Sequence, residues 1–374
     1  MEAGEILEQL YRLWMMAIVK TFRASMSKLL DLYGSAEAVF NLSPEEINSI
    51  KFLSPAEKEV LCQKEIELAK NYLKYIEDNN TRFLTPLDDD FLSALFSIED
   101  MPQGLFCRGN FIDFNDNVLI GVVGARKCTQ YGFSVAKSLS RDIAKEGAII
   151  VSGMALGIDS AAHEGALEAN MPTVAVFGCG VNVTYPASNR ELMKRIMASG
   201  MVISEYPVNC EASKFTFPDR NRIISGISKG LLVVEAGQRS GSLITARLAA
   251  EHGKDLYAVP GNINNSSSKG TNELIKDGAY LVTCAEDITF NYARELERAK
   301  KKYTPKTEEY SYAGSDNNDI ESALLEIMSS EPMSIDSLSA ISGYDVVEVS
   351  TTLLMMELNG KVFSSPTGTY SKNI

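Results

Sequence analysis

Apolar residues in the first part of the chain, over residues 5–75, recur at the spacing of short amphipathic helices. Segments 43–46 and 54–57 each begin with Ser-Pro and place an acidic residue in the following turn, which is typical of a helix start. We therefore predict a small helical domain over residues 1–80. Because no Gly-rich turn joins its helices, the sequence favours generic helical packing over nucleic-acid binding for this domain.

From residue 118 the pattern changes to short, nearly continuous apolar runs that alternate with helical segments. We predict strands at 118–123, 148–152, 173–177, 201–204, 231–235, 256–259 and 280–282. Helices are expected at 131–145, 158–169, 190–198, 221–227 and 242–252. This alternation predicts an α/β domain over residues 81–292 with a doubly wound, mostly parallel sheet. Residues 76–117 resemble a connector, with a short strand at 105–109, and ligands of such sheets bind beyond the carboxyl ends of the strands.

The end of the chain has a third pattern. Residues 293–318 are polar and predict a linker, and residues 319–374 show three helical segments and a two-stranded wing, the layout of a winged-helix domain. The expected recognition helix, 346–358, contains Glu348 and Glu357 and no Lys or Arg. Because phosphates repel carboxylates, this helix favours a protein contact or structural support over direct DNA binding.

Composition narrows the classes of function. In the 374 residues no apolar run approaches the roughly 18 residues of a membrane span, and the N-terminus lacks the basic segment of a signal peptide. The six cysteines are scattered without a C-x-x-C pair, which favours a reducing, cytoplasmic location over a disulfide framework or a zinc site. His163 and His252 are the only histidines, so we expect no His-rich metal centre, and we expect no cofactor.

The net charge of −13 argues at first against a nucleic-acid partner, but the charge is unevenly distributed. Residues 1–107 carry a net charge of −8, residues 108–292 carry zero and residues 293–374 carry −5. The central domain is therefore free to present a local basic face. An even spread of its arginines over the surface explains the same numbers, and charge alone does not separate the two.

Two of the loops that should meet at the carboxyl edge of the sheet are rich in small residues. The loop after the first parallel strand contains Gly124 and Arg126, and the loop after the second contains Ser152, Gly153 and Gly157. Neither is G-x-G-x-x-G, and Ser152 stands where a dinucleotide fold ends its second strand in an acid, so a nicotinamide cofactor is disfavoured.

Two further residues in this region are candidates for catalytic groups. Asp159 and His163 lie at the predicted start of a helix, one turn apart. No nucleophile accompanies them, so we interpret both as groups that satisfy local backbone and packing.

The third loop, 217–226, places Arg220 and Arg222 just after a proline, where we expect the chain to turn from loop to helix. Arginines beside the free N–H groups of a helix start form an anion site, and Asn221 lies between them. Since only Asp219 opposes the two arginines locally, we favour anion binding. The alternative is an internal cluster of ion pairs.

The fourth loop follows the strand at 231–235 and repeats the arrangement with less charge. Ser240 is the expected N-cap of the next helix, and Gly241, Ser242 and Thr245 open that helix toward a phosphate, with Arg239 beside them. The loop lacks the G-K-[ST] of a Walker motif and the G-x-S-x-G of a nucleophile elbow.

Seven sequence blocks across about 105–290 resemble the DprA/Smf family of DNA-processing proteins. They are GARKCTQYG, SGMALGIDSAAH, FGCGVNVTYP, ISEYP, FPDRNRIISGIS, VVEAGQRSGSLITA and AVPGNINNSSSKGTNELIKDGA. The resemblance implies a non-catalytic protein that binds single-stranded DNA, protects incoming DNA, loads the RecA recombinase during natural transformation and forms homodimers through its Rossmann domain. It also implies an extended Rossmann fold for the central domain, with flanking SAM-like and winged-helix domains.

The resemblance assigns roles to particular residues. The family's pocket arginine corresponds to Arg126, its basic motif to Arg220 and Arg222, and its SGS loop to the segment from Ser240 to Thr245. With the loop residues above, the predicted DNA-binding residues are Gly124, Arg126, Ser152, Gly153, Gly157, Arg220, Asn221, Arg222, Arg239, Ser240, Gly241, Ser242 and Thr245.

Two other functions remain open on the sequence. The chain is also similar to nucleotide-hydrolysing enzymes of the lysine-decarboxylase-like Rossmann group, but residues 236–242 lack the second glycine and the downstream acid of their P-G-G-x-G-T-x-x-E block. The third possibility is a sensor of a signalling nucleotide, with the winged helix as its output.

Overall fold

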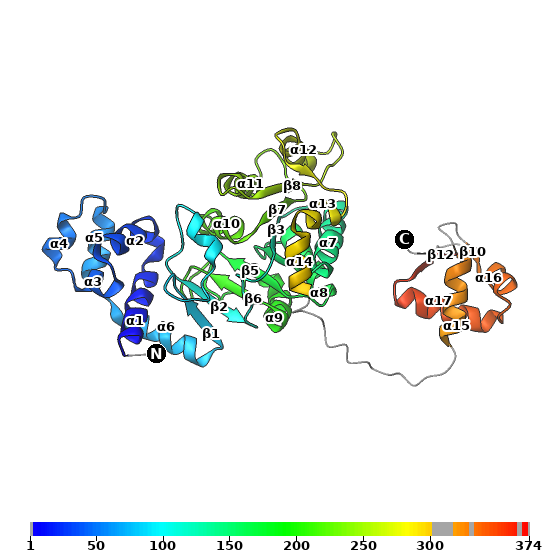
Figure 1. The fold of residues 1–374 in the computed structure, drawn as a ribbon, viewed down its shortest axis with the longest axis horizontal. Coiled ribbons are helices and arrows are strands. Elements are labelled where there is room, and N and C mark those ends of the chain that lie inside the picture. Colours follow the sequence, from blue (N-terminus) through cyan, green and yellow to red (C-terminus); the bar gives the residue numbers. More distant parts are fainter. Residues whose placement is uncertain (1–2, 301–316, 329–332, 365–368, 373–374) are drawn as a thin grey trace. The chain divides into compact units, whose positions relative to one another are not determined.

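The computed structural model describes residues 3–300, 317–328, 333–364 and 369–372 (Figure 1). Its contacts divide the chain into two compact units, Met1–Pro305 and Lys306–Ile374. Residues 301–316, which form most of the predicted linker 293–318, lie outside the described residues. No helix in the described ranges is long and apolar enough to cross a membrane.

The first unit begins with a set of short helices, as the apolar periodicity predicts. They are α1 (Ala3–Ala17), α2 (Val19–Tyr33), α3 (Ala36–Asn41), α4 (Pro44–Ser49), α5 (Pro55–Gln63) and α6 (Ile66–Asp78). Both predicted helix starts are confirmed: Ser43 and Ser54 each form a capping box with the glutamate three residues later. Satisfying these backbone groups fixes where α4 and α5 begin.

A nine-stranded sheet follows, in the order β1-β2-β6-β5-β4-β3-β7-β8-β9. The strands are β1 (Thr81–Leu84), β2 (Leu105–Gly109), β3 (Leu119–Val123), β4 (Ile149–Ser152), β5 (Thr173–Phe177), β6 (Met201–Ser204), β7 (Gly230–Val233), β8 (Asp255–Ala258) and β9 (Tyr280–Leu281). From β3 to β9 all pairs are parallel, and β1 and β2 are antiparallel additions at one edge. The predicted mostly parallel α/β fold is confirmed, whereas the strand β1 was not expected in the connector 76–117.

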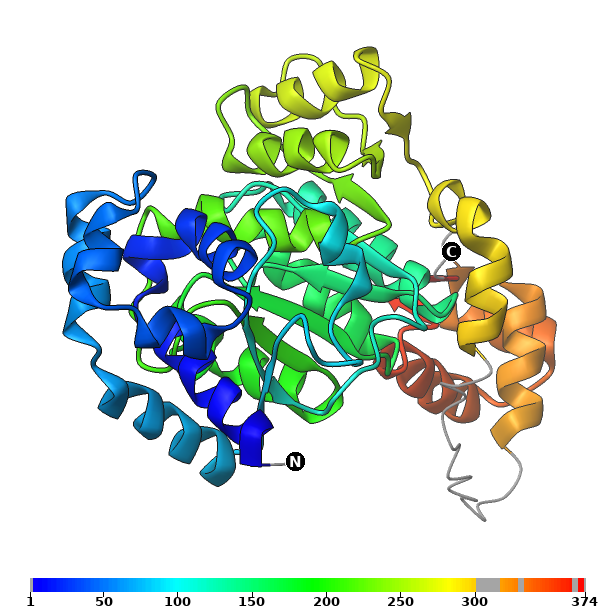
Figure 2. The ribbon, with the colours of Figure 1, turned by 60° about the vertical axis from the view of Figure 1, so that its left-hand side comes forward.

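Helices cover both faces of this sheet (Figure 2). They are α7 (Gln130–Lys145), α8 (Ile158–Glu168), α9 (Arg190–Ser199), α10 (Thr216–Ile227), α11 (Gly241–Glu251), α12 (Lys269–Lys276), α13 (Glu286–Thr289) and α14 (Ala293–Lys300). Successive strand residues point to opposite faces, so Ile120 and Val122 pack with α7 and α8, and Leu119 and Val123 pack with α10 and α11. This alternation within fully apolar strands produces two cores, one on each face.

Two helices of this part lie where the sequence predicts other structure. Helix α10 begins at Thr216, five residues before the predicted 221–227, because Pro218 is compatible with the first turn of a helix. Helix α14 falls inside the segment assigned to a linker, and its Leu296 and Ala299 are buried in the core.

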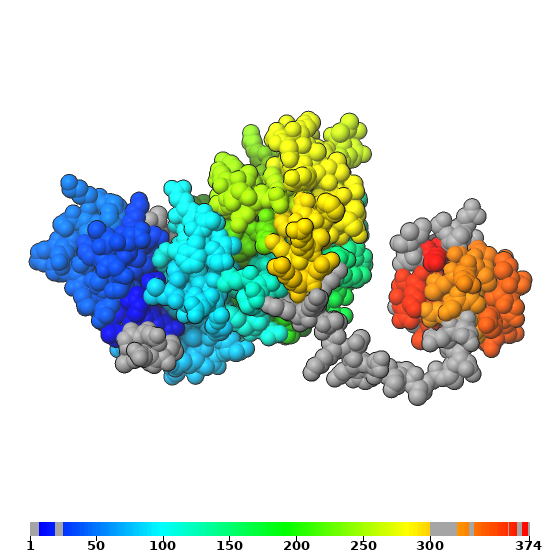
Figure 3. Space-filling model, in the orientation of Figure 1, coloured from blue at the N-terminus to red at the C-terminus, as the bar shows by residue number. Residues whose placement is uncertain are grey.

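The N-terminal helices and the sheet share a core. Apolar side chains of α1 and α2, including Trp14 and Met16, belong to one buried cluster with Phe83, Phe106 and Tyr206 from the sheet and its loops. Figure 3 accordingly shows the helical residues in close contact with the strand residues that follow them. In this structure the helical segment therefore completes one face of the sheet near β1, β2 and β6.

The second unit has the layout of a winged helix, as predicted. It contains α15 (Asn317–Ile327), β10 (Met333–Ser334), α16 (Ile335–Ser342), α17 (Val346–Leu358), β11 (Val362–Ser364) and β12 (Thr369–Lys372). The three strands pair in the order β10-β12-β11 around a small core that includes Leu324, Leu338 and Leu353. Asp345 caps α17, the helix that carries Glu348 and Glu357.

Candidate nucleic-acid interface

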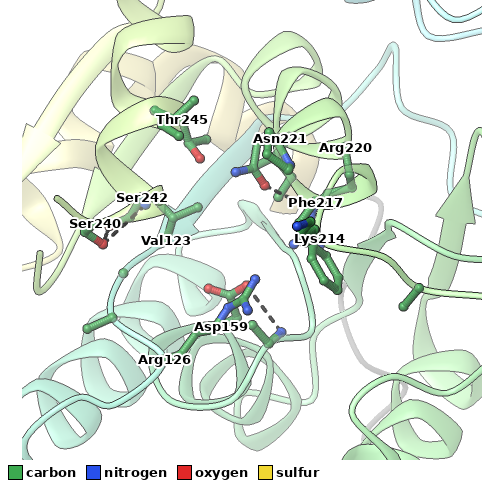
Figure 4. A pocket seen from close by; sticks show the side chains of 18 of the residues that line it. Val123, Arg126, Asp159, Lys214, Phe217, Arg220, Asn221, Ser240, Ser242 and Thr245 are labelled. Atoms are coloured by element: carbon green, nitrogen blue, oxygen red, sulfur yellow. Dashed lines mark hydrogen bonds between the residues drawn. The ribbon is translucent and has the colours of Figure 1, made fainter. Parts of the chain in front are cut away.

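A pocket of about 680 Å³ lies beyond the carboxyl ends of β3 and β7, where the fold class predicts a ligand. Residues of the loops after β3, β4, β5, β6 and β7 line it. Figure 4 shows Arg126 and Asp159 on one side, the Ser240–Thr245 segment on a second and Phe217 with Lys214 on a third. The loops that the sequence predicts to converge therefore do meet around one cavity.

Arg126 lies at the mouth of this pocket with an exposed side chain. Its guanidinium carbon lies 4.9 Å from the centre of the Phe217 ring, whose own centre is 5.3 Å from that of Tyr185. The two rings are tilted by 34°, and aromatic rings with a guanidinium beside them form a surface on which a nucleobase can stack. The DNA-binding residues predicted from the sequence include Arg126 but neither Phe217 nor Tyr185, although Phe217 is the first residue of the block FPDRNRIISGIS.

Two lysines that line the pocket, Lys127 and Lys214, were also missed. Lys214 lies in the loop between β6 and α10, with its ammonium 5.0 Å from the centre of the Phe215 ring. Together with Arg126 they bring three cations to the rim, and among the described ion pairs none involves these three. For Lys214 the local signal was its position next to Phe215 and Phe217 at the start of α10.

Arg220 lies beneath the pocket rather than at a helix start. It sits in the second turn of α10, and only 4% of its surface is exposed. Its Nη1 donates hydrogen bonds to the carbonyl oxygens of Gly153, at 2.6 Å, and Val176. Burial lowers the pKa of Arg220, and the nearby Asp159 carboxylate opposes that shift. The residue therefore acts as a buried positive charge that joins β4, β5 and α10 and reaches the pocket floor.

Asp159 is the carboxylate among the residues that line this pocket. Its Oδ2 accepts a hydrogen bond from the Ala155 N–H at 3.3 Å, as the interpretation of a local backbone partner expects. Burial raises the pKa of Asp159, while Arg220 and Arg126 act in the opposite direction. The same aspartate thus faces the cations of the pocket.

The structure separates Arg222 from the pocket. Residues two apart on a helix point in different directions, so Arg222 leaves α10 on another side from Arg220. Its Nη2 lies 2.5 Å from Glu205 Oε2, its Nε lies 3.4 Å from Asp100 Oδ2, and 6% of the residue is exposed. The sequence places Arg222 at the anion site, whereas in the structure it pairs with Glu205 and Asp100 and is not among the residues that line the pocket.

The small residues of the first two loops let backbones approach one another. Ser152 is buried and donates a hydrogen bond of 2.6 Å to the Val122 carbonyl oxygen. A Cβ on Gly153 would lie 2.2 Å from Arg220 Nη1, and one on Gly124 would lie 2.5 Å from Ile158 Cγ1. Gly124 lines the pocket, whereas Ser152 and Gly153 stand behind it.

Gly157 also lets two loop backbones approach closely, and it does so through its backbone conformation. It precedes α8 with φ 79° and ψ −124°, and a Cβ would lie 2.4 Å from the Ala125 carbonyl oxygen. Gly157 is therefore a packing requirement between the first and second loops and is not among the residues that line the pocket.

The predicted N-cap at Ser240 is confirmed. Its Oγ accepts from the Ser242 N–H at 3.4 Å and lies 2.6 Å from Ser242 Oγ. Ser240, Gly241, Ser242 and Thr245 all line the pocket, and a Cβ on Gly241 would meet nothing within 4 Å. The first turn of α11 is thus open toward the cavity and suited to an anion. Asn221 lines the pocket too, but the exposed Arg239 does not.

Comparison with known proteins agrees with this geometry. Residues 82–293 match the family described as DNA recombination-mediator protein A, and residues 311–368 match the DprA winged helix domain. The chain belongs to the DprA/Smf family. It is 37% identical over 301 residues to Protein Smf of Escherichia coli, covering 79% of each chain. With DNA processing protein DprA of Streptococcus pneumoniae it shares 43% over 202 residues, 54% of this chain and 71% of the relative.

Two solved structures of family members resemble the fold. The X-ray structure of DprA from Streptococcus pneumoniae has a TM-score of 0.64 and 32% identity, and the match covers 76% of this chain and 96% of that one. The structure of DNA processing protein A from Helicobacter pylori, studied for its single-stranded DNA binding mode, has a TM-score of 0.53 and 30% identity, with 58% and 97% covered. The family resemblance inferred from the sequence blocks is confirmed.

In this family member a buried glutamate joins the first and fourth loops. Glu235 follows β7, and its carboxylate accepts hydrogen bonds from the N–H of Thr129 at 2.9 Å and from its hydroxyl at 2.6 Å. Thr129 in turn caps α7 by accepting from the Gly132 N–H. Because Arg126 and Ser240 lie on the two connected loops, Glu235 helps to fix the distance between them.

The histidine of α8 is a packing group. His163 is fully buried, and its Nδ1 lies 2.8 Å from Thr173 Oγ1, whose own proton goes to the Ile150 carbonyl oxygen. The histidine therefore donates from Nδ1, and its Nε2 has no hydrogen-bond partner among the described residues. In the described parts of the chain no group of three or more His, Cys, Asp or Glu side chains is placed to hold a metal ion.

This histidine makes stability depend on pH. Burial lowers the pKa of His163 to about 3, so the unfolded chain, with a pKa near 6.5, binds the proton first as pH falls. The contribution of neutral His163 to the free energy of unfolding is fully present above about pH 6.5. It is lost progressively as pH falls toward 3, by about 2 kcal/mol between pH 7 and pH 5. Urea unfolding at both pH values should show this loss in the unaltered chain and a smaller one in His163→Gln. Equal losses in the two proteins would contradict the assignment.

Proposed function

We propose that this protein binds single-stranded DNA in the pocket between the β3, β6 and β7 loops. One observation carries the proposal: three rim cations, an aromatic pair and the open first turn of α11 surround a single cavity. The similarity to the Helicobacter pylori protein, whose structure concerns single-stranded DNA binding, supports the same conclusion.

The pocket offers separate contacts for the phosphate and for the base of a nucleotide. The first turn of α11 and the side chains of Arg126, Lys127 and Lys214 suit phosphates, because N–H groups and cations hold an anion without reading a base. The Phe217 ring beside Arg126 suits the flat face of any unpaired base. Binding that depends on a base lying on this ring favours single strands over duplex and tolerates most sequences.

We extend the proposal to the role that the family resemblance implies. The protein protects incoming DNA and hands it to the RecA recombinase, acts in the cytoplasm without catalysis, and forms homodimers through the Rossmann domain. Membership of a family described as recombination mediators supports this role. Among the described residues that line the pocket there is one carboxylate, Asp159, and no cysteine or histidine, and this lining favours binding over nucleotide hydrolysis.

Alanine in place of both Arg126 and Lys214 is the test of the DNA site. We expect the affinity for oligothymidine to fall about tenfold or more, and the slope of log K against log salt to become shallower by about 1 for each lost phosphate contact. Fluorescence anisotropy across a salt series measures both. Arg247→Ala, which removes an exposed cation from α11 outside the pocket, is the matched control. Unchanged affinity and slope in the double variant would refute the site.

Incubation with nucleoside monophosphates separates binding from the enzymatic alternative. We expect no free base above the rate of the uncatalysed reaction. Base release that depends on Asp159 would favour the nucleotide-hydrolysing function instead.

A further inference from the structure

A second groove, of about 490 Å³, lies between the N-terminal helices and the loop that follows β6. Leu68, Asn71, Tyr72 and Tyr75 of α6 form one wall, and residues 207–210 form the other. Its volume is in the range of cavities that hold small ligands. Nothing in the pocket described above uses these tyrosines.

The described lining of this groove is neutral, although the segment that supplies α6 is acidic. Residues 1–107 carry a net charge of −8, yet the described residues that line the groove contribute apolar, amide, hydroxyl and thiol groups and no carboxylate. The Tyr72 ring stands edge-on to Phe106, with centres 6.3 Å apart and planes at 83°, which fixes its orientation. Aromatic faces flanked by Asn71 and Asn209 provide stacking and hydrogen-bonding partners for an unpaired base.

The two cavities are separated by one short stretch of chain. Cys210 lines the groove, and Ala212, Ser213 and Lys214 line the first pocket. Two trans peptide units span no more than about 7 Å between Cα atoms, which is close to the distance between successive phosphates of an extended strand. Lys214 therefore supplies a cation near the crossing, and a strand that fills the pocket needs about one more nucleotide to reach the groove.

We propose that single-stranded DNA bound in the first pocket continues across residues 210–212 into this groove, where Tyr72 and Tyr75 contact its bases. The inference rests on the proposed function and adds a second base-binding subsite supplied by the helical domain. It assigns to that domain a direct role in DNA binding, which the sequence disfavours for want of a Gly-rich hairpin.

Oligothymidines of about 2 and about 20 nucleotides separate the two subsites, because a strand that fills the pocket reaches the groove with about one more nucleotide, and whole single-strand sites of this kind cover about 4–16 nucleotides. In a Tyr72→Leu/Tyr75→Leu variant, which keeps apolar bulk but removes both rings, affinity for the long oligonucleotide should fall at least about fivefold. Affinity for the short one should stay as in the unaltered protein. Phe52→Leu removes an exposed ring of the same domain and should change neither.

A cross-linking experiment on the unaltered protein avoids any effect of substitution on folding. The long oligonucleotide carries 5-iodouracil at successive positions, and irradiation is followed by peptide mapping. Cross-links to Tyr72 or Tyr75 are expected at positions a nucleotide or more beyond those that react with Phe217 or Tyr185. Cross-links confined to the first pocket, or equal binding of the long oligonucleotide by the double variant, would overturn the second subsite. Failure of the unaltered protein to bind either length would instead refute the proposed function.

Discussion

Arg222→Ala should destabilise the protein by about 3–5 kcal/mol and leave the affinity of the folded protein for single-stranded DNA unchanged. The substitution removes a guanidinium that is paired with Glu205 at 2.5 Å, and both side chains are almost completely buried. The Glu205 carboxylate then loses its closest described cation in a site that water reaches poorly. Urea unfolding followed by circular dichroism measures the loss.

The control for Arg222→Ala is the exposed pair of Arg247 with Glu251. Arg247→Ala should cost less than about 1 kcal/mol, because solvent screens a surface ion pair. Oligothymidine affinity is compared well below the unfolding midpoint of each variant. A fully stable Arg222→Ala protein with weakened DNA binding would show that Arg222 reaches the DNA after all.

Gly157→Ala should cost more than about 2 kcal/mol of stability and also weaken DNA binding. Its φ of 79° disfavours any L side chain, and the new Cβ would lie 2.4 Å from the Ala125 carbonyl oxygen. That carbonyl accepts the Ile158 N–H and belongs to the segment that positions Arg126. A backbone shift that relieves this clash therefore displaces Arg126.

Gly241→Ala is the matched comparison, since a Cβ there meets nothing within 4 Å. It should leave the free energy of unfolding unchanged and reduce affinity if a phosphate lies against the first turn of α11. Urea unfolding and anisotropy at one salt concentration distinguish the two glycines. Normal stability of Gly157→Ala would contradict the packing role, and normal affinity of Gly241→Ala would place the phosphate elsewhere.

Most of the parallel sheet was predictable because each central strand is a short apolar run between helical segments. Leu119–Val123 and Thr173–Phe177 are buried at every position, which leaves no ambiguity about their place. Strand β1, only Thr81–Leu84, has too few residues for a recognisable period and depends on pairing with β2. The early start of α10 was missed because Pro218 suggested a loop, although proline is tolerated in a first helical turn.

The site was predictable where its signal is local and not where it depends on distant partners. The Ser240 cap is encoded within three residues and could be predicted from them. Arg220 reaches the pocket floor, whereas Arg222 forms internal ion pairs. This difference depends on Gly153, Glu205 and Asp100, none of which is a sequence neighbour. Asp219 is the only acidic residue close to Arg222 in the sequence. With two arginines and one aspartate in this segment, one arginine has no local partner, and the sequence therefore favours a bound anion as its partner.

A chain that began at residue 81 would carry Phe83, Phe106 and Tyr206 on its surface, because the N-terminal helices supply the other half of their core. Contiguous exposed aromatic and aliphatic groups of this kind drive self-association. Trimming this protein to its α/β part would therefore expose an apolar surface that promotes self-association. Any shortened form made for crystallisation or for binding assays should keep α1 and α6, or replace these three aromatic residues with polar ones.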